Sequence, residues 1–303
     1  MTKNQFSQIT ICICTFKRPV LLERLLRKLD RLESIPQILY SIVVVDNDLS
    51  QSARTVVEEF SRASRLSTVY SFEPEQNISL ARNRSVNLAN GELIAFIDDD
   101  EFPSSNWLVA LYRTLVEHEA DAVLGPVKPH LTPAIPDWLV KSKVLERREY
   151  ETGYQMRDHS QTRTGNVLIR KNVFESSEDY FDPEYGRSGG GDAMFFKRAI
   201  NKGKKIVWCN EAIVYEEVPP ERCTSIYYFR RACTRGLTTA WEVPFLSINT
   251  IKSILAVILY TISLPFSLLL GRHLFFRLLV KSFDHGSKLL AYFGVKLVSQ
   301  RPY

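Results

Sequence analysis

The first hundred residues alternate between short apolar runs and amphipathic helical segments, and this alternation constrains the fold more than any other feature. Short, bounded apolar runs are typical of strands buried on both faces. Helical crossovers between them bring successive strands into one sheet in the same direction. The sequence therefore predicts an α/β, Rossmann-like, mostly parallel central sheet flanked by helices. The apolar runs are residues 9–14, 42–45, 68–72 and 93–97, and the helical segments between them are 19–32, 55–60 and 79–89.

Acidic residues follow two of these predicted strands. Asp98, Asp99, Asp100 and Glu101 come directly after the run 93–97, and the segment 46–48, which reads Asp-Asn-Asp, follows the run 42–45. The carboxyl ends of parallel strands share one edge of a sheet, which is where α/β proteins bind ligands. Adjacent carboxylates repel one another, and a divalent cation would relieve that repulsion. The simpler alternative for each cluster is a solvated acidic turn.

A glycine-rich turn later in the chain presents another acid. Three glycines, 189–191, precede Asp192 and a predicted helix over 193–202. Such glycines allow a tight turn or the close approach of backbone to a ligand. Asp192 at the start of the helix is suited to N-capping, to catalysis, or to both.

Several protein classes are not indicated. The chain has neither GxGxxG nor GxxxxGK[ST], so no dinucleotide fingerprint or P-loop is present. Its five cysteines form no CxxC and its five histidines no HxxxH, so we expect reduced thiols in the cytoplasm and no zinc site. The first ten residues contain no apolar signal core, so secretion is not expected.

The C-terminal part has a different composition. The chain carries a net charge of +5, but residues 243–303 alone carry +6, which leaves −1 for residues 1–242. We therefore expect a folded domain over 1–242 and a membrane-associated helical region over 243–303. A basic and apolar tail favours anionic lipid, and we expect no nucleic-acid partner.

Two segments of this tail carry the membrane prediction. Residues 253–271 contain no charge and are close to the length needed to span a bilayer. Residues 273–288 place polar side chains at three- or four-residue spacing on an otherwise apolar helix, which is typical of an interfacial helix. A buried core hairpin remains an alternative, and the choice between a spanning and an interfacial tail stays open.

Six short motifs in order give the chain a resemblance to a known family. The set resembles inverting glycosyltransferases of family 2, which have the GT-A fold, over residues 8–240. The C-terminal part and the region of Glu216 resemble the bacterial surface-polysaccharide members of the exopolysaccharide (succinoglycan-type) group. The motifs are CTFKRP (14–19), VVVDN (43–47), NISLARN (77–83), FIDDDE (96–101), TGN (164–166) and GGGD (189–192).

The resemblance implies an enzyme of the hexosyltransferase type. Such an enzyme moves a sugar, with inversion, from a nucleotide-sugar donor to a saccharide acceptor during surface-polysaccharide biosynthesis. By resemblance the donor is UDP-linked and the acceptor lipid-linked, on a polyprenyl diphosphate. The resemblance places the transfer reaction at the cytoplasmic face of the inner membrane, with Mg²⁺ or Mn²⁺ as cofactor.

The resemblance also assigns roles to individual residues. Asp192 matches the catalytic base, Asp98 faces the ribose or the metal, and Asp100 binds the metal. Glu216 stands where many relatives have a histidine metal ligand, and either ligates the metal or pairs with Arg222. The nucleotide-sugar site would further include Thr15, Phe16 and Arg18 in the first loop, Asp46 on the base, Asn77 near the base, Arg82 as a countercharge to the acids, and Asp99.

Two other functions compete with this interpretation. A sugar-phosphate nucleotidyltransferase also uses a Rossmann-like sheet and acidic metal ligands, but it would need a glycine-rich phosphate loop after the first strand. A catalytically inactive, membrane-bound saccharide-binding protein would lack the base or carry a broken acid cluster. The sequence contains both the base and the cluster.

Overall fold

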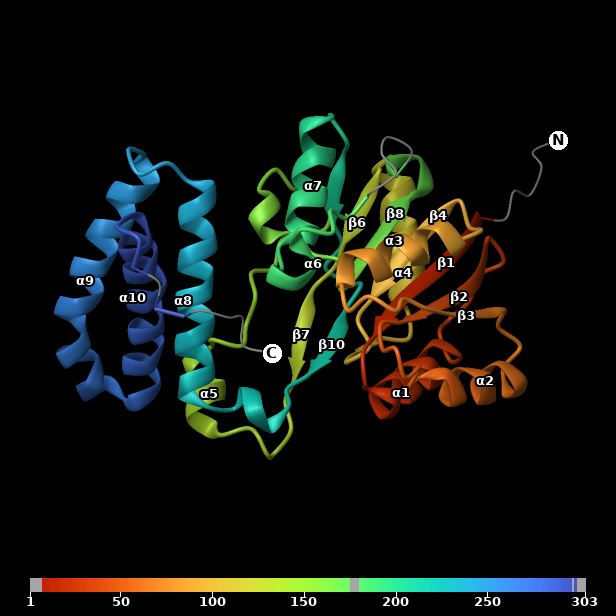
Figure 1. Cartoon of the computed structure of the whole chain (residues 1–303), viewed down its shortest axis with the longest axis horizontal. Coiled ribbons are helices and arrows are strands. Elements are labelled where there is room, and N and C mark those ends of the chain that lie inside the picture. The colour runs from red at the N-terminus through yellow and green to blue at the C-terminus, as the bar shows by residue number, and fades with distance from the viewer. Residues whose placement is uncertain (1–6, 175–179, 296, 299–303) are drawn as a thin grey trace. The chain divides into compact units, whose positions relative to one another are not determined.

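The computed structural model describes residues 7–174, 180–295 and 297–298 (Figure 1). The start of the chain and the basic residues Lys296 and Arg301, on which part of the tail prediction rests, lie outside these ranges. The chain divides into two compact units. One comprises Met1–Lys128 and Arg147–Glu217, and the other comprises Pro129–Glu146 and Val218–Tyr303.

The first unit is built on a seven-stranded sheet with the strand order β3-β2-β1-β4-β8-β6-β9. Its strands are β1 (Ser7–Thr15), β2 (Ile38–Asp46), β3 (Thr68–Phe72), β4 (Leu93–Ile97), β6 (Ala122–Leu124), β8 (Asn166–Arg170) and β9 (Ile206–Trp208). Its helices are α1 (Pro19–Leu29), α2 (Arg54–Ala63), α3 (Ile78–Leu88), α4 (Trp107–Glu117), α6 (Tyr185–Ser188) and α7 (Gly191–Asn201).

Strands β1 to β4 are parallel, as the alternation of strands and helices predicts. Strand β8 runs antiparallel to both β4 and β6, so the sheet is mixed beyond β4. The α/β fold class is therefore confirmed. The antiparallel strand has no signal in the local pattern, because strand direction depends on the connection and not on side-chain periodicity.

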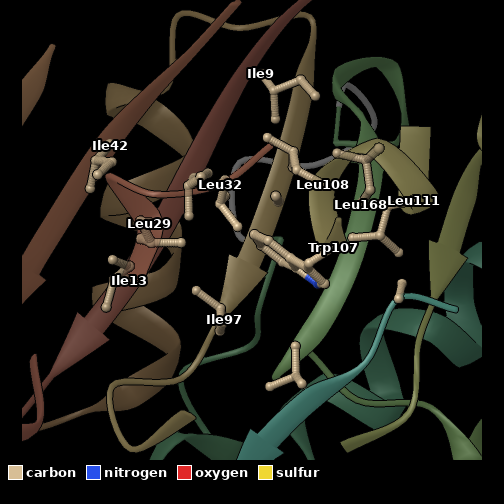
Figure 2. Packing of buried hydrophobic residues seen from close by; sticks show 14 of the residues in the cluster. Ile9, Ile13, Leu29, Leu32, Ile42, Ile97, Trp107, Leu108, Leu111 and Leu168 are labelled. Atoms are coloured by element: carbon tan, nitrogen blue, oxygen red, sulfur yellow. The ribbon is translucent and has the colours of Figure 1, made fainter. Parts of the chain in front are cut away.

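Helices cover both faces of the sheet, and each face has its own apolar core. Alternate strand residues point to opposite faces, so Ile11 and Ile13 join one core while Cys12 joins the other. Helices α1, α2 and α4 contribute to the first core, and α3 and α7 to the second. Figure 2 shows Trp107 of α4 among side chains from β1, β4 and β8 in the first core. This double layer fixes the carboxyl ends of β1, β2 and β4 along one edge.

A small sheet, β5-β10-β7, lies beside the carboxyl end of β4. Its strands are β5 (Glu101–Pro103), β7 (Val127–His130) and β10 (Val214–Glu217). The chain breaks between β6 and β7 at Gly125 and Pro126. At the break, a side chain on Gly125 would meet Asn166 at 2.6 Å and the Ala212 carbonyl at 2.5 Å, and the following Pro126 has no N–H to pair.

The second unit is helical and consists of α5 (Asp137–Ser142), α8 (Ser225–Glu242), α9 (Ile248–Leu270) and α10 (Arg272–Tyr292). Helix α10 lies between α8 and α9 (Figure 1). The sequence placed a domain boundary after residue 242, whereas this unit already includes α8, because α8 packs against α10. Helix α9 is the one described helix that is long and apolar enough to cross a membrane.

Helix α10, which the sequence predicts to be an interfacial helix, is partly buried within its own unit. Phe276 and Val280 are buried in a core shared with α5 and α8, and Gly236 of α8 packs against the backbone of α10. Of the two helices, α9 exposes more large apolar side chains, while α10 exposes Phe283 and Leu290. A polar stripe along a helix marks a solvated face in one setting and a face of buried polar contacts in another, and the sequence pattern does not separate the two.

Candidate active site

The acidic cluster lies where β4 ends, and its carboxylates are largely buried. Asp99 and Asp100 are 5% and 8% exposed, and Glu101 is 2% exposed. Strand β4 is apolar on both faces and leads straight into this cluster, so the chain emerges at the sheet edge already carrying four acids. Burial of so many carboxylates is costly unless cations or hydrogen-bond donors accompany them.

Two residues supply some of these donors and cations, one at the end of β1 and one in the loop that follows it. The Thr15 hydroxyl donates to Asp99 Oδ2 at 2.7 Å, and Arg18 Nη1 lies 3.0 Å from both Asp99 Oδ1 and Asp100 Oδ2. The half-buried Phe16 lies between them in sequence, with the Lys17 ammonium over its ring. The first loop is thus attached to the acidic cluster.

The cost of burying these carboxylates appears in the pKa values of the cluster. Burial, reinforced by repulsion from Asp98, Asp99 and Glu216, raises the pKa of Asp100 to about 7, although Arg18 opposes the shift. Burial also raises the pKa of Asp98 and of Asp99, and it raises that of Glu101 well above its usual range. Burial is therefore the largest cause of the raised pKa at each of these four carboxyls.

Arg82 of α3 is one of those cations. It acts against burial to lower the pKa of Asp98, and its guanidinium also lies over the Phe181 ring at 5.6 Å. Helix α3 packs against β1 and β2 and carries Arg82 about one turn from its start. Arg82 therefore lies near Asp98, and its role as a countercharge during the reaction stays a prediction.

The TGN motif forms one wall of the site. A side chain on Gly165 would meet Glu101 Oε1 at 2.7 Å and Asp98 Oδ2 at 2.9 Å, so only glycine fits beside both carboxylates. The next residue, Asn166, is fully buried, accepts from the Trp107 indole at 2.8 Å and donates to two carbonyl groups. Asn166 thus holds the wall in place while Gly165 leaves room for the acids.

Glu216 reaches the cluster through the small sheet. In the antiparallel pairing of β10 with β5, Glu216 lies opposite Glu101. Its carboxylate adds to the raised pKa of Asp98 and of Asp100, and it forms an ion pair with Arg147. The structure thus gives Glu216 a partner that the sequence did not suggest, and its roles as metal ligand or partner of Arg222 remain predictions.

Asp192, at the start of α7, lies near the cluster. Gly189 and Gly190 adopt φ values of +81° and +93°, which confirms that these glycines form a tight turn. The Asp192 carboxylate accepts from the Ala193 N–H at 3.0 Å and lies near enough to Asp98 to contribute to its raised pKa. The carboxyl end of β4 and the glycine turn, which are far apart in sequence, therefore lie at one site.

Arg163 lies among these acids and was not singled out by the sequence. Burial, together with repulsion from Arg147, lowers its pKa to about 10, while attraction to Asp192, Glu101 and Glu216 opposes that shift. Its position directly before the TGN motif was the one available signal. Arg147 had none, because its pairing with Glu216 joins residues that only the fold brings together.

Asp46 and Asn77, predicted near the nucleotide base, have structural contacts. The Asp46 carboxylate is fully buried and accepts from the backbone N–H groups of Asp48 and Ala53 and from the Tyr70 hydroxyl. Asn77 caps α3 by accepting from the Ser79 N–H at 3.0 Å. These contacts shape the loop after β2, and the predicted contacts with the base remain predictions.

The carboxylates fit a divalent cation by their chemistry. Asp98, Asp100 and Glu216 present only oxygen ligands and repel one another, which suits Mg²⁺ or Mn²⁺. In the described part of the chain, no three His, Cys, Asp or Glu side chains are arranged as a ready metal cage. Mg²⁺ is commonly bound through one or two carboxylates plus substrate phosphates, so a complete protein cage is not required.

Comparisons with known proteins agree with this architecture. The chain is 34% identical over 241 residues to the succinoglycan biosynthesis protein ExoM of Rhizobium meliloti (strain 1021), a match that covers 78% of this chain and 75% of ExoM. It is 26% identical to the glycosyltransferase AglE of Haloferax volcanii over 60% of this chain and 58% of AglE.

Solved structures show the same fold at low sequence identity. S. aureus TarS (residues 1–349) in complex with UDP-GlcNAc matches with a TM-score of 0.57 at 18% identity, over 75% of this chain and 66% of that one. The mannosyltransferase PcManGT from Pyrobaculum calidifontis, in complex with GDP-Man and Mn²⁺, matches with a TM-score of 0.56 at 15% identity, over 97% and 77%. These likenesses establish a GT-A-like fold.

The family assignment rests on the sequence itself. The profile described as "Glycosyl transferase family 2" matches residues 10–176, which is more than half of the chain and includes the first loop, the acidic cluster and the TGN motif. Together with the similarity to ExoM, this match shows that the chain belongs to glycosyl transferase family 2 and is a glycosyltransferase.

Proposed function

We propose that this protein transfers a sugar, with inversion, from a UDP-sugar to a lipid-linked saccharide during the synthesis of a surface polysaccharide. The observation that carries the proposal is that Asp192, from the start of α7, lies near Asp98 of the acidic cluster at the end of β4. An inverting transfer needs a base on the acceptor side and charge stabilisation on the leaving-group side of one sugar. The two groups of carboxylates meet that requirement.

Asp192 would remove the proton from the acceptor hydroxyl as that oxygen attacks the anomeric carbon. Asp192 lies in the first turn of α7, and the Arg163 guanidinium lies near enough to be attracted to it. The nucleoside diphosphate would leave on the side of Asp98 and Asp100. A divalent cation held by these two acids and Glu216 would supply electrostatic stabilisation of the developing diphosphate charge.

The identity of the donor and acceptor rests on relatives. ExoM is named for succinoglycan biosynthesis, and TarS was solved with UDP-GlcNAc, which supports a nucleotide-sugar donor and a polysaccharide product. PcManGT was solved with GDP-Man, so a guanine nucleotide is the competing donor class. The apolar helix α9 supports association with a membrane. The cytoplasmic face of the inner membrane and a lipid-linked acceptor are proposed from the resemblance.

A donor screen tests the proposal. The purified full chain is incubated with UDP- and GDP-sugars and Mg²⁺ or Mn²⁺, and release of the nucleoside diphosphate is measured with and without a lipid-linked saccharide. We expect release from a UDP-sugar that increases with acceptor. Absence of release from every donor would favour a binding protein without catalysis.

The variant Asp192→Asn tests the assignment of the base. It keeps an oxygen for the Ala193 N–H but cannot accept a proton, so we expect transfer to fall at least about 100-fold. Binding of UDP, measured by calorimetry, should stay within about twofold because the charge removed lies on the acceptor side. Near-normal transfer would show that another group is the base.

A further inference from the structure

Helix α9 has a polarity opposite to that of a helix in a soluble domain. Its buried residues are polar, namely Thr250, Ser253 and Ser267, which are 2–3% exposed. Its exposed residues are large and apolar and recur every three or four positions, which places them on one face. We call this the outer face of α9, and it comprises Ile251, Leu255, Ile258, Ile262, Phe266 and Leu269.

The inner face of α9 forms polar contacts with α10. Lys288 of α10 is 4% exposed and donates to the Asn249 carbonyl at 3.2 Å and to Ser253 Oγ at 3.3 Å. His285 Nδ1 lies 3.2 Å from the same hydroxyl. A helix packed on a soluble core turns its apolar stripe inward, whereas α9 turns that stripe outward, toward an apolar medium.

The length of α9 alone would allow it to cross a bilayer. Its 23 residues extend about 34 Å at 1.5 Å per residue, compared with about 30 Å for the hydrocarbon core. The sequence therefore leaves two arrangements open, a helix that spans the membrane and a helix that lies in its surface.

The packing of α10 against α9 separates these two arrangements. The contacts of Asn249 with Lys288 and of Ser253 with His285 show that the helices are antiparallel along their length. Lys281 lies over the Tyr260 ring at 5.8 Å, close to the middle of α9. If α9 crossed a bilayer, α10 would carry this cation to the middle of the hydrocarbon, where a charge is very costly.

The ion pair between α8 and α10 would be affected in the same way. Asp284 lies next in sequence to His285, which contacts α9, and it pairs with Arg235 of α8 at 3.0 Å. A spanning α9 would therefore carry parts of three helices and a salt bridge into the membrane. An in-plane α9 leaves all of these groups on the aqueous side.

We propose that α9 lies in the plane of an anionic bilayer, with its outer face in one leaflet, and does not cross the membrane. The occupant of this face is anionic lipid, because the segment from residue 243 carries a net charge of +6 and exposed basic residues, Lys252 and Arg272, lie near the two ends of α9. The inference rests on the proposed membrane location of the enzyme and not on its proposed chemistry.

Cysteine labelling of the full chain in inverted inner-membrane vesicles tests the inference. Single cysteines are introduced as Lys252→Cys, Ile258→Cys and Arg272→Cys, with Val116→Cys on α4 as an exposed control site. A membrane-impermeant maleimide is added outside the vesicles, and labelling of the parent chain is subtracted. We expect positions 252 and 272 to label within about twofold of position 116, and position 258 to label at least about tenfold less until detergent is added.

Three results would overturn the inference. Labelling of position 252 with protection of position 272 until detergent is added would show a spanning helix. Crosslinking of Ile258→Cys to a second copy by a bifunctional maleimide would show that protein covers the face. Recovery of the chain in the soluble fraction would show that lipid does not cover the outer face of α9. Release of nucleoside diphosphate, measured on the same vesicles, separates each of these results from a failure of the proposed chemistry.

Discussion

The ends of β2 and β4 look alike in sequence and differ in their electrostatics. Both strands end in acids, 46–48 after β2 and 98–101 after β4. After β2, hydrogen bonds from the Ser50 hydroxyl and backbone lower the pKa of Asp48, and Asp46 accepts three donors from its surroundings. After β4, burial and mutual repulsion raise the pKa of Asp100 to about 7.

The difference shows which acids stabilise the fold and which are held against their own repulsion. Acids that accept backbone N–H groups stabilise a loop in the charged state. Acids that repel one another in a buried site destabilise the fold and persist where function requires them. The first cluster therefore forms the loop after β2, and the second is the candidate for binding a ligand with positive charge.

The largest expected effect separates the two clusters by activity. Asp100→Asn removes a proposed metal ligand, and we expect sugar transfer to fall about 100- to 1000-fold. Asp48→Asn, the matched change at the end of β2, should reduce transfer less than about tenfold, since its carboxylate is engaged with Ser50. Equal losses in initial rates at saturating donor would remove the distinction between the clusters.

The same two variants should change stability in opposite directions. The folded-state pKa of Asp100 is raised from 3.8 to about 7, so its free energy contribution to the fold becomes more unfavourable as pH rises through this interval. One pKa unit corresponds to about 1.36 kcal/mol, so Asp100→Asn should raise the free energy of unfolding by about 2 to 4 kcal/mol at pH 8 without metal. The gain should disappear near pH 4.

Asp48 has the opposite sign because its pKa is lowered in the folded state. Its contribution is favourable at neutral pH and is lost as pH falls through the folded-state pKa. Asp48→Asn should therefore lower the free energy of unfolding by about 1 kcal/mol at pH 7, with a smaller loss at low pH. Urea unfolding at pH 4.5, 6 and 8 in EDTA measures both variants, and effects of the same sign would refute the comparison.

A smaller effect concerns Asp46, the deepest acid after β2. Asp46→Asn places an amide NH₂ where a carboxylate oxygen accepted a donor, so one buried group loses its partner. We expect the free energy of unfolding to fall by about 1 to 3 kcal/mol. If Asp46 also accepts a hydrogen bond from the base, the preference for UDP over GDP should fall about tenfold in calorimetric titrations. An unchanged preference would leave Asp46 with its structural role alone.

Much of the fold could be predicted because its signals are local. Strand β3 matches its apolar run residue for residue, and α3 and β4 follow their periodicity. The antiparallel direction of β8 and the formation of the small sheet could not be predicted, since both depend on pairing between distant segments. That sheet brings Glu216 opposite Glu101, so the third proposed metal ligand was available only by resemblance.

The tail and the cations of the site show a different limit of the sequence. The apolar periodicity of α9 and α10 was visible, but which helix exposes it depends on packing with α8. Arg147 gave no signal and Arg163 only its position before the TGN motif, because an arginine near an acid is recognised only when the fold brings the two together. Motifs thus identified the acids, while the groups that balance their charge required the structure.

The smallest expected effect tests whether the β4 cluster depends on the backbone beside it. Gly165→Ala would place a methyl group 2.7 Å from Glu101 Oε1 and 2.9 Å from Asp98 Oδ2, so one carboxylate must move. We expect transfer to fall about tenfold, because small displacements at a reacting site cost this much or more. Gly286→Ala in α10 is the control, since nothing lies within 4 Å of the new methyl group, and it should leave transfer unchanged. Equal rates for the two variants would mean that the β4 cluster tolerates displacement as readily as a solvated acidic turn, and the contrast with β2 would then rest on charge alone.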